Sequence, residues 1–177
     1  MEAERAHTMK PWRAIVSVAV AAATVVVLPT TAEASPYCVQ DLAGGPQACF
    51  TTEQALESHQ ADLALSPLLT VFDSTDWHGG SGYLNFASAY GRTYCDAPKV
   101  PNEASEGNLG LRHFSNGLNV AGRISSYVIK AGSGCSVTFW TGTGFNGNGV
   151  TSNQNCENLT RCFGRLFNDN TLSLAVS

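Results

Sequence analysis

The chain has 177 residues, of which 14% are charged and 44% are hydrophobic, and its formal net charge is -4. This balance excludes a basic surface for nucleic acid, because phosphate recognition needs an excess of lysine and arginine. Residues 35–177, which follow a predicted leader, suffice for one ordinary domain and not for two.

The first 34 residues have the pattern of a secretory signal. Lys10 and Arg13 precede an uncharged apolar run over 14–28, and small residues follow just before Ser35. A membrane anchor is the alternative, but the run is shorter than the roughly 20 residues that span a bilayer. The sequence therefore predicts a signal peptide over 1–34, a secreted (extracellular) protein, and no membrane contact after cleavage.

All six cysteines lie after the predicted cleavage point, and an even number on an exported chain indicates disulfide bonds. Short separations favour the pairs Cys38–Cys49 and Cys156–Cys162, which leaves Cys95–Cys135, although the sequence alone also allows other connectivities. A zinc site or a reactive thiol usually shows a CxxC or HExxH pattern, and the sequence contains neither.

The segment 35–67 is predicted to be a cysteine-containing N-terminal segment with one helix over 51–65. Thr51 followed by Gln54 fits a capping box at the start of this helix. Apolar residues then recur at spacings of three and four until Pro67 ends the pattern.

From residue 68 onward the sequence predicts an antiparallel β domain that extends to residue 177. Short runs of β-branched and aromatic residues alternate there with clusters of Gly, Asn, Ser and Asp. The polar stretch 96–119 contains two prolines, shows no clear periodicity and is long for a loop in a compact domain. It is interpreted as an insertion.

One aromatic motif occurs twice in the β region: an aromatic residue, four residues, a second aromatic residue, one residue and glycine. The two copies consist of Phe72, Trp77 and Gly79, and of Trp140, Phe145 and Gly147. Serines follow in strand-like runs at 125–126 and at 173. A chain that folds back over its own sheet needs a positive φ where a Cβ would clash, so both glycines are expected to adopt it. The two rings of each copy are expected to pack on each other, and two related halves are implied.

These motifs, with their downstream serines, resemble the signature of the βγ-crystallin Greek key over roughly residues 68–176. The resemblance implies an all-β fold, a βγ-crystallin-like double Greek-key sandwich, with one short N-terminal helix before it. The family includes a branch of secreted bacterial metalloprotease inhibitors built on a single domain with disulfides. A monomer is expected.

Microbial βγ-crystallins often bind calcium through a loop of two Asn or Asp, two variable residues, Ser or Thr, and Ser. The second half matches this pattern in part, with Asp169, Asn170 and Ser173 as candidate ligands. The first-half segment 121–126 has no side-chain oxygen at its two leading positions and contains Arg123. The alternative to calcium is a structural turn in which Asp169 and Asn170 bond their own backbone. No other cofactor is indicated.

If the protein resembles the inhibitor branch, it needs a stiff loop that docks into a peptidase, and the start of the predicted insertion is the candidate. A cysteine there would anchor a loop whose prolines restrict the backbone, and a stiff loop loses less entropy on docking. The alternative is a loop that merely covers the sheet. The family's own reactive-loop sequence has no counterpart here, so the resemblance carries over the class and not the residues. The hypothesis is inhibition of a secreted protease through Cys95, Pro98, Lys99, Val100 and Pro101.

The sequence does not predict an enzyme. The three histidines after the signal, His59, His78 and His113, fall on the predicted helix, in the first aromatic motif and in the predicted insertion. A GxSxG nucleophile elbow is absent, and the carboxylates form no recognisable catalytic frame. The remaining alternatives are a calcium-binding structural or cell-envelope protein and a killer-toxin-like antimicrobial protein.

Overall fold

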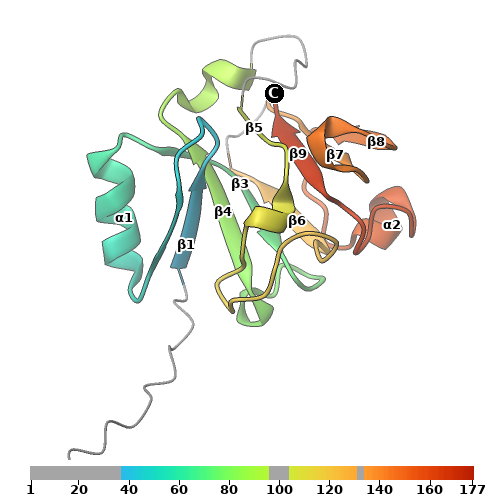
Figure 1. Ribbon diagram of the computed structural model, residues 1–177, viewed down its shortest axis with the longest axis horizontal. Coiled ribbons are helices and arrows are strands. Elements are labelled where there is room, and N and C mark those ends of the chain that lie inside the picture. The colour runs from blue at the N-terminus through green and yellow to red at the C-terminus, as the bar shows by residue number, and fades with distance from the viewer. Residues whose placement is uncertain (1–36, 96–103, 131–133) are drawn as a thin grey trace, which may run out of the picture. The chain divides into compact units, whose positions relative to one another are not determined.

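The computed structural model describes residues 37–95, 104–130 and 134–177 (Figure 1). The predicted signal peptide and four residues of the predicted inhibitory loop, 98–101, lie outside these ranges. All described residues belong to one unit, Glu33–Ser177. No helix within the described ranges has the length and apolar character needed to cross a bilayer.

The described residues form nine strands and two α-helices. In chain order they are β1 (Tyr37–Asp41), β2 (Gln47–Phe50), α1 (Glu53–Asp62), β3 (Ser66–Phe72), β4 (Tyr83–Ser88), β5 (Ala104–Glu106), β6 (Ser126–Ile129), β7 (Val137–Trp140), β8 (Gly149–Ser152), α2 (Leu159–Phe163) and β9 (Ser173–Val176).

The strands build two sheets, with the orders β2-β1-β4-β3-β6 and β5-β9-β7-β8 (Figure 1). The predicted mostly-β fold is therefore confirmed. Two segments cross between the halves of the chain. β5 comes from the first half and pairs with β9 of the second sheet. In the opposite direction, Cys156 forms an antiparallel bridge with Tyr127 of β6 in the first sheet. Each sheet thus receives one segment of the other half, as in a double Greek key.

The polar stretch interpreted as an insertion contributes to the second sheet. Ala104–Glu106 form β5, and Ala104 is fully buried opposite Val176 of β9. A three-residue strand is too short to show a period of two in the sequence. Further along, the main chain of His113 exchanges two hydrogen bonds with the side-chain amide of Gln47 on β2.

The main core lies between the two sheets. The last five residues of β3 are buried, and Leu68, Leu69 and Val71 of this strand lie in the main core. They pack in one cluster with Phe86 of β4 and Phe139 of β7. Each such side chain contributes about 1.5–3 kcal/mol when it leaves water, so this cluster holds the two halves together.

The N-terminal segment extends the first sheet. β1 lies parallel to β4 and antiparallel to β2, and α1 packs on the side of this sheet away from the second sheet (Figure 1). A small separate cluster of Val39, Leu56, Leu65 and Ala87 holds the helix there. The hydrogen bonds of β1 cover the edge of β4 that would otherwise be open to other chains.

The helix differs at both ends from the sequence prediction. Thr52, not Thr51, is the N-cap, and its hydroxyl accepts a hydrogen bond from the N–H of Ala55 at 3.2 Å. The helix ends at Asp62 because Ala64 adopts a positive φ of 52°. The sequence pattern continued further because Leu63 is apolar, yet this side chain is 50% exposed.

The three predicted disulfides, Cys38–Cys49, Cys95–Cys135 and Cys156–Cys162, are all present. The first joins β1 to β2, and the third joins Cys156, which follows β8, to Cys162 within α2. Three disulfides indicate an oxidising compartment.

Candidate functional site

The flanks of segment 96–103 are both fixed to the second half of the chain. Cys95 is bonded to Cys135, just before β7. On the other side, Ala104 begins β5 and pairs with Val176 at the C-terminus. Pro98, Lys99, Val100 and Pro101 lie outside the described residues. The structure therefore shows how this segment is attached at both ends.

The second aromatic motif has the predicted geometry. The rings of Trp140 and Phe145 lie 5.3 Å apart with an edge-to-face angle of 71°. Gly147 has a φ of 79°, and a Cβ on it would lie 2.7 Å from Oγ1 of Thr141. Ser173 closes the hairpin: its hydroxyl donates to the carbonyl of Gly142 at 2.6 Å and accepts from the N–H of Phe145 at 3.1 Å.

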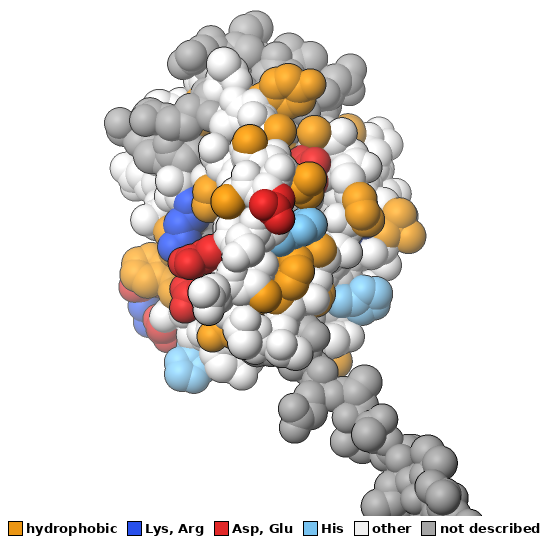
Figure 2. Space-filling model, turned by 90° about the vertical axis from the view of Figure 1, so that its left-hand side faces the viewer, with side chains coloured by type: hydrophobic (Ala, Val, Ile, Leu, Met, Phe, Trp, Pro, Cys, Tyr) orange, Lys and Arg blue, Asp and Glu red, His pale blue; other side chains and the backbone are white. Residues whose placement is uncertain are grey.

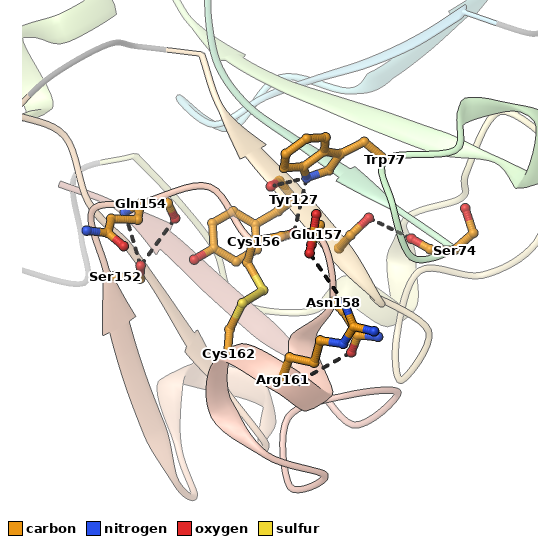
Figure 3. The surroundings of a disulfide bond; sticks show 11 residues. Ser74, Trp77, Tyr127, Ser152, Gln154, Cys156, Glu157, Asn158, Arg161 and Cys162 are labelled. Carbon is orange, nitrogen blue, oxygen red and sulfur yellow. Dashed lines mark hydrogen bonds and ion pairs between the residues drawn. A yellow bond between two sulfur atoms is a disulfide. The ribbon is translucent and has the colours of Figure 1, made fainter.

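The first aromatic motif departs from the prediction. Phe72 contacts the ring of Tyr83 on the neighbouring strand, with centroids 6.2 Å apart, and not that of Trp77. The indole N–H of Trp77 instead donates to the carbonyls of Tyr127 and Cys156, at 3.0 and 3.2 Å (Figure 3). Trp77 is 42% exposed, so its contribution is mainly this polar contact at the point where the second half joins the first sheet.

Gly79 does not adopt the positive φ that the motif predicted. The positive values fall on Asp76 (61°) and Trp77 (55°). The matching positions of the second copy, Gly144 and Phe145, both have a φ of 64°. The two hairpins thus share the same left-handed pair of residues, and only the final glycine differs. In the first copy a 3-10 turn over 79–81 replaces the turn that requires glycine.

The serines fix the register between the two halves. Ser126 donates to the carbonyl of Ser74 at 2.6 Å, as Ser173 does to Gly142. Ser74 and Gly142 occupy the same position of the motif, so Ser173 corresponds to Ser126. The loop that matches 121–126 is therefore 168–173, one residue earlier than the sequence comparison placed it.

The three predicted calcium ligands engage different partners. Ser173 is fully buried and its hydroxyl serves the hairpin. The amide of Asn170 donates to the carbonyl of Leu166. Asp169 alone faces the other half, where its carboxylate accepts a hydrogen bond from the hydroxyl of Ser125 at 3.1 Å.

Asp169 and Ser125 line an open polar cleft of about 390 Å³ together with Asp73, Gly122 and Arg123. The guanidinium of Arg123 lies 2.8 Å from the carboxylate of Asp73. The hydrogen bond and charge of Asp73, with a smaller contribution from Asp169, raise the pKa of Arg123. A fixed cation thus already compensates these carboxylates. Among the described residues no three His, Cys, Asp or Glu side chains converge, and this donor set fits calcium poorly.

The histidines occupy unrelated surroundings. His59 packs against the ring of Phe50, with centroids 5.0 Å apart. His78 and His113 are exposed, in the first aromatic motif and in the segment after β5. Sequence reasoning did not find the Arg123–Asp73 pair, because 50 residues separate the two and no local motif links them. It also missed Tyr127, whose pKa is raised by burial between the sheets.

No protein-family model and no curated protein matches this chain. Among solved structures, the chain is similar to a βγ-crystallin domain from Flavobacterium johnsoniae, with 20% identity, a TM-score of 0.40, and coverage of 62% of this chain and 93% of that one. It is also similar to the N-terminal domain of Protein S, with 19% identity, a TM-score of 0.40, and 63% and 96% coverage. A βγ-crystallin domain from Clostridium beijerinckii gives 15% identity, a TM-score of 0.39, and 62% and 95% coverage.

Proposed function

We propose that this protein is a secreted binding protein, without catalytic activity of its own, that inhibits a peptidase through segment 96–103. The observation that carries the proposal is the attachment of both flanks: Cys95 is bonded to Cys135, and Ala104 is paired within the second sheet. A segment anchored at both ends loses less conformational entropy when it docks into an active-site cleft than a free chain does.

The same attachment opposes release after cleavage. If a peptidase cut a bond between Cys95 and Ala104, the disulfide and the β5–β9 pairing would still hold the two new ends to one body. Retention of both ends favours religation and slow departure of the segment from the peptidase. Metalloproteases of the thermolysin type are the first class to test, because the resemblance in the sequence points to inhibitors of such enzymes.

The test is an inhibition assay with the disulfide-bonded protein at stoichiometric amounts against thermolysin-like and serine proteases. We expect inhibition of at least one metalloprotease, and we expect the double substitution Lys99→Gly with Val100→Gly to abolish it without changing the Tm. Cys156→Ser with Cys162→Ser is a second variant: it removes a disulfide that is remote in sequence from the segment, and we expect it to leave inhibition unchanged although it lowers the stability. Undiminished turnover across both panels overturns the proposal. A rise in Tm with millimolar calcium would instead favour the structural calcium-binding role.

A further inference from the structure

A second concave region lies on the outer face of the first sheet, beside α1. It is a cleft of about 260 Å³ whose floor comes from β1, β3 and β4 and whose wall includes residues of α1. This volume is below the about 300–1,000 Å³ of sites for drug-sized ligands, so it suits a single ring or one unit of a chain. The cleft shares no residue with the segment 96–103.

Aromatic rings form much of the cleft. Phe72 of β3 and Tyr83 of β4 are direct cross-strand partners, with ring centroids 6.2 Å apart and planes inclined by 41°. Tyr37 of β1 lines the same cleft and, like Tyr83, is half-buried. The face of an aromatic ring carries partial negative charge and attracts the weakly positive C–H groups of an apolar ligand face.

Fixed polar groups accompany these rings. The hydroxyl of Thr70 donates to Oδ1 of Asn85 at 2.7 Å and orients this amide. Nδ2 of Asn85 makes no hydrogen bond with the described residues, so its two N–H groups are available as donors. Burial raises the pKa of Tyr83, as do Tyr37 and Glu53 nearby, so its phenol stays a neutral donor. Glu53 supplies an acceptor at the wall.

The cleft offers no backbone to a peptide. β3 is paired on both sides, by β4 and β6, and β4 is paired by β3 and β1. A peptide that adds a strand needs an open sheet edge, and none lies in this floor. The charges at the cleft, Glu53 and Lys130, have opposite signs. The side that carries α1 shows both acidic and basic side chains, with Lys and Arg toward the left-hand edge of the view (Figure 2).

We propose that this cleft binds one ring of a neutral saccharide chain. A sugar ring presents an apolar C–H face to the rings of Tyr37 and Tyr83, and its hydroxyls match the amide of Asn85 and the carboxylate of Glu53. Phe72 holds Tyr83 in place from below. The proposal is independent of peptidase inhibition, because the two sites share no residue.

The second half of the chain supplies an internal control. Thr138 of β7 and Thr151 of β8 pair at the positions that Thr70 and Asn85 occupy in the first half, and their hydroxyls lie 2.8 Å apart. Gly149 stands where the first half has Tyr83, opposite Trp140. The outer face of the second sheet therefore lacks both the second ring and the free amide.

The test is titration of the disulfide-bonded protein with cellohexaose and with the hexamer of N-acetylglucosamine, followed by calorimetry and by NMR shifts. We expect binding of at least one hexamer, weakened at least tenfold by Tyr83→Ala and by Asn85→Ala. Tyr83→Phe keeps the ring and is expected to lose only threefold to tenfold. Thr151→Ala is the matched control and is expected to leave the affinity unchanged. The Tm of each variant establishes that it is folded.

Three outcomes overturn the proposal. The first is no binding of either hexamer at millimolar concentration. The second is binding that Tyr83→Ala and Asn85→Ala leave intact in folded protein. The third is binding of an anionic saccharide such as polygalacturonate without binding of the neutral hexamers. None of these outcomes bears on peptidase inhibition, which is measured separately with the 99–100 variant.

Discussion

The two folded hairpins share a backbone and differ in the side chains that hold it. In the second, Trp140 packs on Phe145, and Ser173 bonds the turn at two points. In the first, Trp77 reaches out of the hairpin to the carbonyls of Tyr127 and Cys156. The second hairpin is thus stabilised from within, whereas the first helps to attach the segment that crosses from the other half.

The two sheets also differ in the strands that flank them. The first sheet gains β1, β2 and α1 beyond β4, while β8 remains the edge of the second sheet. The added strand β1 brings Tyr37 to the cleft that Tyr83 also lines. Aromatic rings therefore line a cleft in the first half, whereas in the second half they close a hairpin. The two hairpins share the left-handed pair of residues before the final glycine, and the cross-strand partners determine what each ring does.

The largest effect is expected from the link between the halves. Cys95→Ser with Cys135→Ser opens a separation of 40 residues and should lower the free energy of unfolding by about 4 kcal/mol in the chain-entropy estimate. Cys156→Ser with Cys162→Ser opens a separation of 6 residues and should cost about 2 kcal/mol. Urea unfolding measures both. Equal losses would show that the link between the halves is not the dominant constraint.

The two motif glycines should respond differently to the same substitution. Gly147→Ala places a Cβ 2.7 Å from Oγ1 of Thr141 at a φ of 79°, and we expect a loss of about 2–3 kcal/mol. Gly79 has no positive φ, and its added Cβ would meet Tyr83 at an ordinary 3.6 Å. Gly79→Ala should therefore stay within about 0.5 kcal/mol. A large loss at Gly79 in thermal unfolding would contradict the described turn.

Local chemistry made much of this architecture predictable. The β runs, the pair Trp140 and Phe145 and the positive φ of Gly147 follow from patterns within a few residues. Short separations favoured the observed disulfide pairs, although the sequence alone left other connectivities open. The role of Gly79 was mispredicted because a 3-10 turn can close the same spacing.

The contacts that the sequence did not predict join segments that are far apart in the chain. β1 runs parallel to β4, and Arg123 pairs with Asp73 across 50 residues. In neither case does a local sequence motif identify the interaction partner. The sequence also assigned Ser173 to calcium, because a serine in a fold motif and a serine ligand look alike until their hydrogen bonds are known.

Replacing Ser173 or Ser126, the serines that close the two hairpins, should change the free energy of unfolding by different amounts. Ser173→Ala leaves two main-chain groups without a partner, at Gly142 and Phe145, and should cost about 2 kcal/mol. Ser126→Ala leaves only the carbonyl of Ser74 and should cost about 1 kcal/mol. Both serines are fully buried, so exposure does not explain a difference. Urea unfolding with unchanged m-values is the measurement, and a reversed order would mean that the first hairpin is the more tightly closed.

The smallest effect concerns Tyr127, which lies where the halves meet. Its ring contacts Phe139, it is fully buried, and its hydroxyl lies near Ser152 but meets no partner in good hydrogen-bond geometry among the described residues. At neutral pH, Tyr127→Phe should therefore change the free energy of unfolding by less than about 1 kcal/mol. In Figure 3 the side chain of Tyr127 extends toward the side of Ser152.

The effect of Tyr127→Phe on the free energy of unfolding should become measurable at high pH. Burial raises the pKa of Tyr127 above 10.0, the ordinary value that it regains on unfolding. The stabilising contribution of the neutral phenol is therefore complete below pH 10 and is lost as the pH rises toward the folded-state pKa. Above pH 10 the wild type should lose up to about 1.4 kcal/mol per pH unit more than Tyr127→Phe. The residual slope in the variant reports other groups, including Tyr83, whose pKa is also raised. Among the described residues no free cysteine is present to start disulfide exchange during the measurement. If the pH profiles of the wild type and Tyr127→Phe ran parallel, the phenol of Tyr127 would ionise equally in the folded and unfolded states, and the prediction would be wrong.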